Sequence, residues 1–167
     1  MISKSTHPRE IEMAKNDVLR SIRDALGIDD ATMIQIFRHA GREVGQSTIT
    51  ALLKTEEQDG YIPCSDPILG FFLDGLIIHK RGQREDQPTT AEKPAAALTN
   101  NAVLKKLRIA LDLKEDDLVG ILKSGGLAVS THELTALFRK QGHKHYKECS
   151  DQLLRGFFKG IALRPKG

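Results

Sequence analysis

Residues 61–77 read YIPCSDPILGFFLDGLI, and residues 146–162 read YKECSDQLLRGFFKGIA. The two stretches share a Tyr, a Cys-Ser-Asp tripeptide, a Leu, a Phe and a Gly at the same spacing, 85 positions apart. The match extends outward, because the same offset places residues 16–82 on residues 101–167 without a gap. Of the 67 aligned pairs, 20 are identical. A fixed offset with this many identities indicates an internal duplication.

The duplication divides the 167-residue chain into four parts. Residues 1–15 are an N-terminal extension, residues 16–82 the first repeat, residues 83–100 a linker and residues 101–167 the second repeat. The linker contains two prolines, two adjacent threonines and three adjacent alanines, and it has no sustained apolar period. Such a segment buries little surface, so we expect a flexible connector.

The predicted fold class is all-α, a tandem duplication of a four-helix module with a flexible linker. Apolar residues make up 40% of the chain, but aromatic residues only 5% and Trp is absent, a composition that favours packed helices over sheets. Apolar residues recur at helical spacing from Val18 to Leu26, with Asn16 as the expected cap. A second helix is expected to stop at Gly41, which can take the left-handed conformation.

The third and fourth helices also have sequence signals. In the second repeat, Ser130 and Glu133 form the pattern of a capping box. The fourth helix of the first repeat begins at Ser65 and is too apolar for a surface helix, so we expect it at the centre of its repeat. Gly75 and its counterpart Gly160 lie inside these central helices, at a cost of about 1 kcal/mol each relative to Ala. Either another backbone approaches closely there, or the glycine is inherited without purpose.

The sequence indicates a cytoplasmic protein. Residues 1–15 carry charges and no apolar stretch, which argues against a secretory signal or a transit peptide. The longest apolar run, residues 68–78, contains Asp74 and has about half of the length that spans a bilayer. The two cysteines, Cys64 and Cys149, are too few for a disulfide scaffold, and we expect both to be structural thiols.

The formal charge of +3 hides a difference between the repeats. The first repeat has 7 Lys and Arg against 10 Asp and Glu, and the second has 13 against 7, which gives net charges of −3 and +6. The loop before the last helix is acidic in the first repeat and basic in the second. It can attract phosphates or an acidic protein, including the first repeat of a neighbouring chain, or it can be simply solvated. The candidate contacts are the loop residues Arg139, Lys140, Lys144 and Lys147, together with Lys105 and Lys106 near the start of the second repeat.

A helix–turn–helix can be drawn through residues 33–54 and again through residues 118–140. The turn is one or two residues longer than in the common DNA-reading version. The exposed positions of each second helix are polar but not basic. Aromatic residues are too scarce for single-strand binding by stacking, so this interpretation leaves duplex DNA or structured RNA.

Metal binding and nucleophilic catalysis have weak support. His143, His145 and Cys149 could bring three donors together, but the first repeat has Gln58 and Gly60 at the two histidine positions. The Cys-Ser-Asp tripeptide would place a thiol near a helix N-terminus, yet a buried cysteine beside a helix cap explains the pattern better. We expect no metal, no cofactor and no enzymatic activity.

A repeated arginine borders the apolar face of each first helix. Arg23 and Arg108 hold equivalent positions, close enough in pattern to pair with a carboxylate such as Asp66 or Asp151. We predict structural ion pairs at both places.

Several stretches resemble the bacterial YehS-like family, a two-copy domain of unknown function. They are residues 51–54 (ALLK), 64–66 (CSD), 72–77 (FLDGLI), 80–82 (KRG), 103–110 (VLKKLRIA) and 149–155 (CSDQLLR). The resemblance covers residues 16–163 and supports the repeat and a cytoplasmic setting. It implies no activity and no ligand residues, because the family has no established function.

The leading hypothesis is a non-enzymatic helical module that binds protein partners or self-associates through its repeat surfaces. Two copies of different charge suit bridging, because each can engage a different surface or the two can pack against each other. The alternative is a nucleic-acid-binding protein with helix–turn–helix-like repeats that uses the basic face of the second repeat.

Overall fold

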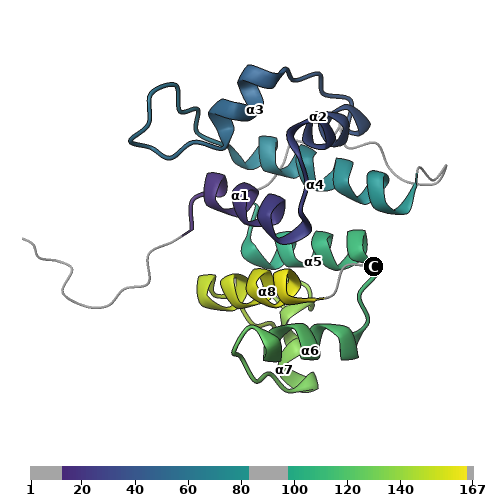
Figure 1. Ribbon diagram of the computed structural model, residues 1–167. Helices are drawn as coiled ribbons and strands as arrows, with labels where there is room; N and C mark the ends of the chain where they lie inside the picture. Colours follow the sequence, from purple (N-terminus) through teal and green to yellow (C-terminus); the bar gives the residue numbers. More distant parts are fainter. Residues whose placement is uncertain (1–12, 83–97, 165–167) are drawn as a thin grey trace, which may run out of the picture.

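The computed structural model describes residues 13–82 and 98–164, and every regular element in these ranges is a helix (Figure 1). The first repeat holds α1 (Lys15–Leu26), α2 (Asp30–His39), α3 (Gln46–Leu52) and α4 (Asp66–Arg81). The second holds α5 (Asn100–Leu111), α6 (Glu115–Ser124), α7 (Thr131–Leu137) and α8 (Asp151–Leu163). The predicted all-α duplication of a four-helix module is confirmed. Among these described helices, none is long and apolar enough to cross a membrane.

Short polar side chains begin several helices where the sequence predicts them. The hydroxyl of Ser65 accepts a hydrogen bond from the backbone at the start of α4, and Ser130 and Glu133 form the predicted capping box of α7. One predicted cap is wrong. Asn16 lies inside α1, and Ala14 is the N-cap residue without a side-chain hydrogen bond.

The described part of each repeat begins three residues before the predicted boundary, at residues 13 and 98. Met13 and its counterpart Leu98 are both buried. Thr99 caps α5 by accepting a hydrogen bond in its first turn. These residues belong to the packed repeats, although they were assigned to the extension, residues 1–15, and to the linker, residues 83–100. The remainder of both segments lies outside the described residues.

The two repeats pack against each other by a reciprocal pairing of helices. α1 packs against α8, and α5 packs against α4, and both pairings are more extensive than those between the first and last helices of one repeat (Figure 1). The 85-residue offset relates α1 to α5 and α4 to α8, so the same contact is made twice, as across a two-fold dimer interface. The repeats therefore form one body.

Two repeated aspartates reinforce this pairing. Asp66, in the first turn of α4, accepts a hydrogen bond from the Leu98 amide at 2.9 Å. Asp151, in the first turn of α8, accepts one from the Met13 amide, also at 2.9 Å. Because the two donors are themselves equivalent, each last helix holds the chain that leads into the first helix of the other repeat.

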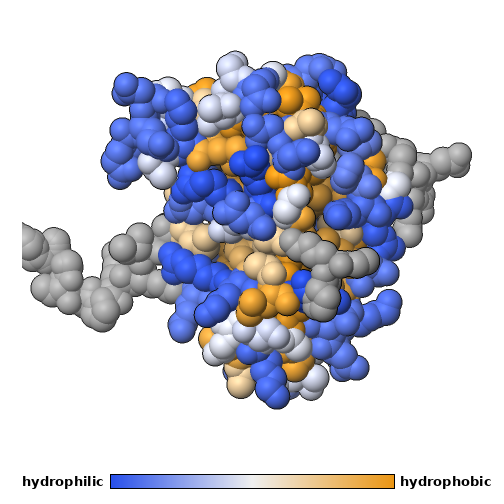
Figure 2. Space-filling model, in the orientation of Figure 1, coloured by the Kyte–Doolittle hydropathy of each residue, from blue (hydrophilic) through white to orange (hydrophobic). Residues whose placement is uncertain are grey.

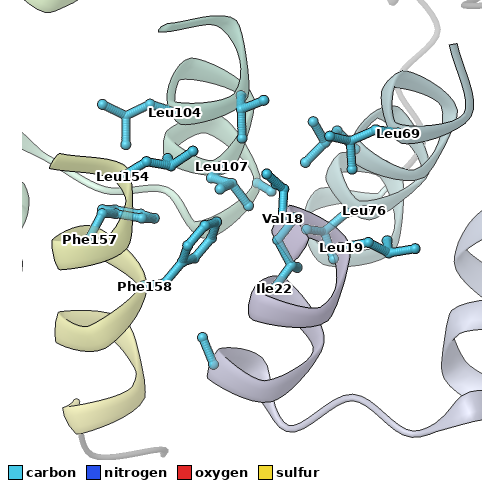
Figure 3. Packing of buried hydrophobic residues seen from close by; sticks show 14 of the residues in the cluster. Val18, Leu19, Ile22, Leu69, Leu76, Leu104, Leu107, Leu154, Phe157 and Phe158 are labelled. Carbon is cyan, nitrogen blue, oxygen red and sulfur yellow. The ribbon is translucent and has the colours of Figure 1, made fainter. Parts of the chain in front are cut away.

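The central core lies where α1, α4, α5 and α8 meet, and α2 with α3 and α6 with α7 cover it on opposite sides (Figure 1). Apolar side chains from all four central helices converge there, and a void of about 10 Å³ between α1, α5 and α8 shows how closely they fill the space. The buried residues labelled in Figure 3 are Val18, Leu19, Ile22, Leu69, Leu76, Leu104, Leu107, Leu154, Phe157 and Phe158.

The repeated glycine of each last helix marks a close approach of two backbones. A Cβ atom added to Gly75 would lie 2.0 Å from the carbonyl oxygen of Ile36 on α2. A Cβ atom added to Gly160 would lie 1.9 Å from the carbonyl oxygen of Ile121 on α6. Of the two explanations left open by the sequence, the structure supports close packing.

We expect Gly75→Ala to lower the free energy of unfolding by about 2 kcal/mol. The added methyl group must displace the α2 backbone, and that cost exceeds the gain in helix propensity. Urea unfolding of the full chain measures the change.

Gly70→Ala is the matched control on the same helix, because a Cβ atom there meets nothing within 4 Å. It should raise the free energy of unfolding by up to about 1 kcal/mol. Changes of the same sign in both variants would contradict the close-approach explanation.

Candidate functional site

A buried asparagine fixes the loop between the third and fourth helices of each repeat. In the second repeat, Nδ2 of Asn101 donates to the carbonyl oxygens of Leu137 and Lys147, each at 2.9 Å, and its Oδ1 accepts from the Cys149 amide at 2.8 Å. Asn16 makes the three equivalent hydrogen bonds in the first repeat. Buried backbone groups need such partners, so the loop is held to the start of α5. Sequence reasoning missed this role, although identity in both repeats was a signal for it.

The six predicted cations lie in different environments. Lys106 is not free, because its ammonium group pairs with Asp74 of α4 across the boundary between the repeats. Lys147 is exposed and pairs with Glu133 of α7 at 3.4 Å. Lys105 is exposed on α5. Two of the three are therefore already paired with a carboxylate.

The other three cations follow α7 directly. Lys140 and Lys144 are exposed, and Arg139 is half-buried. Among the described residues, no carboxylate pairs with any of them. We call these three residues the basic loop cluster. Together with the exposed Lys105 on α5, it is the part of the predicted cationic surface that the structure leaves open to a partner.

A groove of about 360 Å³ opens beside the basic loop cluster. Side chains from the end of α5, the start of α6, α7 and the loop that follows it line this groove. They are Arg108, Glu115, Leu134, Thr135, Phe138, Arg139, Lys140 and His143. Three permanent cations against one carboxylate make the groove positive, while the half-buried Phe138 ring gives it an apolar surface.

The ion pairs predicted for Arg23 and Arg108 with Asp66 or Asp151 are wrong. Both aspartates are used in the contact between the repeats. Nη2 of Arg23 instead pairs with Asp30, at the start of α2, at 2.8 Å. The carboxylate sits on the helix that follows the arginine in sequence, so the pairing is local.

Arg108 has no such partner. Its Nε donates to the Leu113 carbonyl oxygen at 3.1 Å, and its guanidinium carbon lies 4.7 Å from the centre of the Phe138 ring. Among the described residues, no carboxylate forms an ion pair with it. The equivalent arginines therefore differ, since one is neutralised and the other is not.

The three proposed metal donors are not arranged as a site. Nδ1 of His143 accepts a hydrogen bond from the His145 amide at 2.9 Å, and both histidines are exposed. Cys149 is buried below the loop. Within residues 13–82 and 98–164, no group of three or more His, Cys, Asp or Glu side chains could hold a metal ion.

The helix–turn–helix interpretation gains little from the geometry. Six residues join α2 to α3, and six join α6 to α7, where three or four are usual. The would-be recognition helix α7 has seven residues, and its Glu133 side chain is engaged with Ser130 and Lys147. Its exposed side chains include no Lys or Arg.

Comparison with known proteins agrees with the duplication. A family model described as "Protein of unknown function (DUF1456)" matches twice, at residues 15–82 and 100–167. The chain belongs to this family. The uncharacterized protein YehS of Escherichia coli (strain K12) is 41% identical over 152 residues, which cover 91% of this chain and 96% of YehS. No solved structure matches the chain. Membership of DUF1456 brings no activity with it, so any function must be argued from the residues of this chain.

Both cysteines should react slowly with thiol reagents in the folded protein. Burial raises the pKa of Cys64 and of Cys149 to about 12, so almost no thiolate is present at pH 8. An aromatic disulfide reagent should label both cysteines slowly in buffer, and as fast as cysteines of an unfolded chain only after urea is added. Fast labelling of either thiol in buffer would reopen the possibility of a cysteine nucleophile.

Proposed function

We propose that this protein is a non-enzymatic binding module whose second repeat docks an acidic protein partner. The observation that carries the proposal is the basic loop cluster, which lies beside an open groove on a fold whose other copy has an acidic loop at the equivalent place. The two repeats share their core and their loop anchors, and they differ in the charge that they present.

The loop of the first repeat uses its polar groups internally. The ammonium group of Lys54 donates to the Asp59 carbonyl oxygen, and Gln58 accepts from the amide of Thr55 at 2.8 Å. This loop projects from the body beyond α3 and is mostly hydrophilic in the space-filling view (Figures 1 and 2), although its Ile62 is 39% exposed. In the second repeat, Lys140 and Lys144 remain exposed without such contacts. Of the two equivalent loops, the second repeat's loop is therefore the one with exposed lysines whose side chains make no hydrogen bond or ion pair among the described residues.

The shape of the molecule suits binding at one end. α2 and α3 lie on one side of the central helices, and α6 and α7 on the other (Figure 1). A partner at the basic loop cluster would leave the acidic loop of the first repeat accessible. The second repeat could hold one partner while the first repeat contacts another, which would make the protein a bridge.

The composition of the groove favours a polypeptide over nucleic acid. The half-buried Phe138 ring offers an apolar surface beside the cations, and an acidic peptide with apolar side chains can use both. A phosphate backbone uses the cations alone, and α7 provides no basic side chains for the major groove. Nucleic-acid binding is the second candidate, supported by the exposed lysines of the loop.

We also propose a cytoplasmic location, and the two cysteines support both this location and the non-enzymatic role. Both thiols are buried with raised pKa values, so they are poor nucleophiles. Two buried, unpaired thiols also suit a reducing compartment.

The full chain should bind a fluorescent peptide rich in Glu and Leu more tightly than a fluorescent DNA duplex at the same moderate ionic strength. Lys140→Glu with Lys144→Glu should weaken peptide binding about tenfold, because the two charge reversals together cost about 1–2 kcal/mol. Fluorescence anisotropy over a range of salt concentrations measures both affinities.

Lys123→Glu with Lys159→Glu changes the net charge equally at exposed positions outside the loop, and it should leave peptide affinity nearly unchanged. Equal weakening in both double variants would reduce the effect to net charge. Tighter binding of the duplex, lost in the loop variant, would instead establish the nucleic-acid alternative.

A further inference from the structure

The unpaired Arg108 gives the groove a feature that net charge alone does not supply. Its guanidinium group is held on two sides, by the hydrogen bond from Nε to the Leu113 carbonyl oxygen and by the Phe138 ring. An arginine fixed in this way has lost much of its side-chain freedom before any ligand arrives. The entropic cost of binding is therefore reduced.

The first repeat shows what happens when a carboxylate occupies the same place. Asp30 pairs with Arg23 at 2.8 Å, and the other oxygen of Asp30 accepts from Nε2 of Gln46 at 2.8 Å. In the second repeat, Glu115 stands where the first has Asp30. Its Oε2 accepts from the Thr135 hydroxyl at 3.4 Å, and the arginine is left without a carboxylate partner. Both repeats thus have a carboxylate at this position, and it pairs with the arginine only in the first repeat.

We propose that Arg108 forms the centre of an oxyanion site in this groove, for a carboxylate or phosphate group attached to an apolar portion. This rests on the proposed function, because the site would be the specific anchor for the acidic partner. Arg108 would bind two oxygens of the anion through its planar fork, and Arg139 and Lys140 would stand at the rim. The apolar portion would lie against the half-buried Phe138 ring.

The size and charge of the groove suit this ligand. A space of about 360 Å³ lies at the lower end of the range for small-ligand sites and can take one acidic side chain or a short-chain acid. Glu115 is the single carboxylate in the lining, against three cations. Its carboxylate lies in the first turn of α6, where the helix dipole stabilises a negative charge without an ion pair to Arg108.

The equivalent surface of the first repeat lacks the side chains that form this site. Leu53 replaces Phe138, Thr55 replaces Lys140, and Lys54, in place of Arg139, donates to the Asp59 carbonyl oxygen. We therefore expect one anion site per chain. The first repeat serves as an internal control.

The test uses the full chain, with hexanoate and inorganic phosphate as probes in separate NMR titrations. Hexanoate should shift the amide signals of Leu134, Phe138 and Arg139 and leave those of the first repeat in place. Arg108→Gln should weaken hexanoate binding at least about tenfold, as expected for the loss of a charged bidentate contact. Arg23→Gln, at the equivalent position, should leave it unchanged.

A second variant covers the case in which Arg108→Gln disturbs the fold. Lys140→Glu removes a rim cation without touching the hydrogen bond to Leu113, and it should also weaken hexanoate binding. Phosphate binding that depends on Arg108 while hexanoate fails to bind would assign the site to phosphate groups alone and would overturn the apolar part of the proposal.

Two other outcomes separate this proposal from the proposed function. If Lys140→Glu with Lys144→Glu abolishes peptide binding but Arg108→Gln changes neither probe, the docking function stands and the Arg108 site is wrong. If the acidic peptide, hexanoate and phosphate all fail to bind at low salt, both proposals are wrong.

Discussion

Each repeat places its first helix against the last helix of the other repeat, and the rest of the structure depends on this exchange. α1 buries Val18, Leu19 and Ile22, and Ile22 faces Phe158 of α8 (Figure 3). A single repeat would leave such a face open to water, at about 25 cal/mol for each Å² exposed. Asp66 and Asp151 make the pairing specific, because each accepts a hydrogen bond from a backbone amide just before the other repeat's first helix. The two repeats of one chain thus pair as the two subunits of a two-fold dimer would. Because they are covalently joined, each is present at high local concentration near the other.

This shared constraint explains where the two repeats could diverge. The central helices serve both halves, so a change there disturbs two contacts, and the glycine on α4 and α8 and the asparagine on α1 and α5 occur in both. The loops after α3 and α7 face solvent beyond the core, and the buried asparagines hold them whatever side chains they carry. Charge could therefore change sign in one repeat at little cost to stability. Arg23 and Arg108 follow the same logic, since one kept a carboxylate partner and the other did not.

Much of the fold was predictable because it depends on local patterns. Helical spacing, the serine caps and the glycines of the last helices all act within one helix or between neighbours. The exchange of helices was not predictable, because the apolar face of α1 has the same pattern whichever α4-like helix covers it. Asn16 was predicted as a cap because caps and buried polar anchors draw on the same residue type. For the site, counting charges in the sequence found the basic loop. It could not show that Lys106 pairs with Asp74 or that Arg108 has no carboxylate partner, because both facts depend on neighbours in three dimensions.

The exchange can be tested most directly by cutting the chain between the repeats. A specific protease sequence is inserted within residues 83–97, the folded protein is cleaved, and the products are separated by size under native conditions. The reciprocal pairing predicts that the two fragments elute together as a one-to-one complex of the parent size and separate only when unfolded. Two fragments that elute apart, each folded with four helices, would contradict the account.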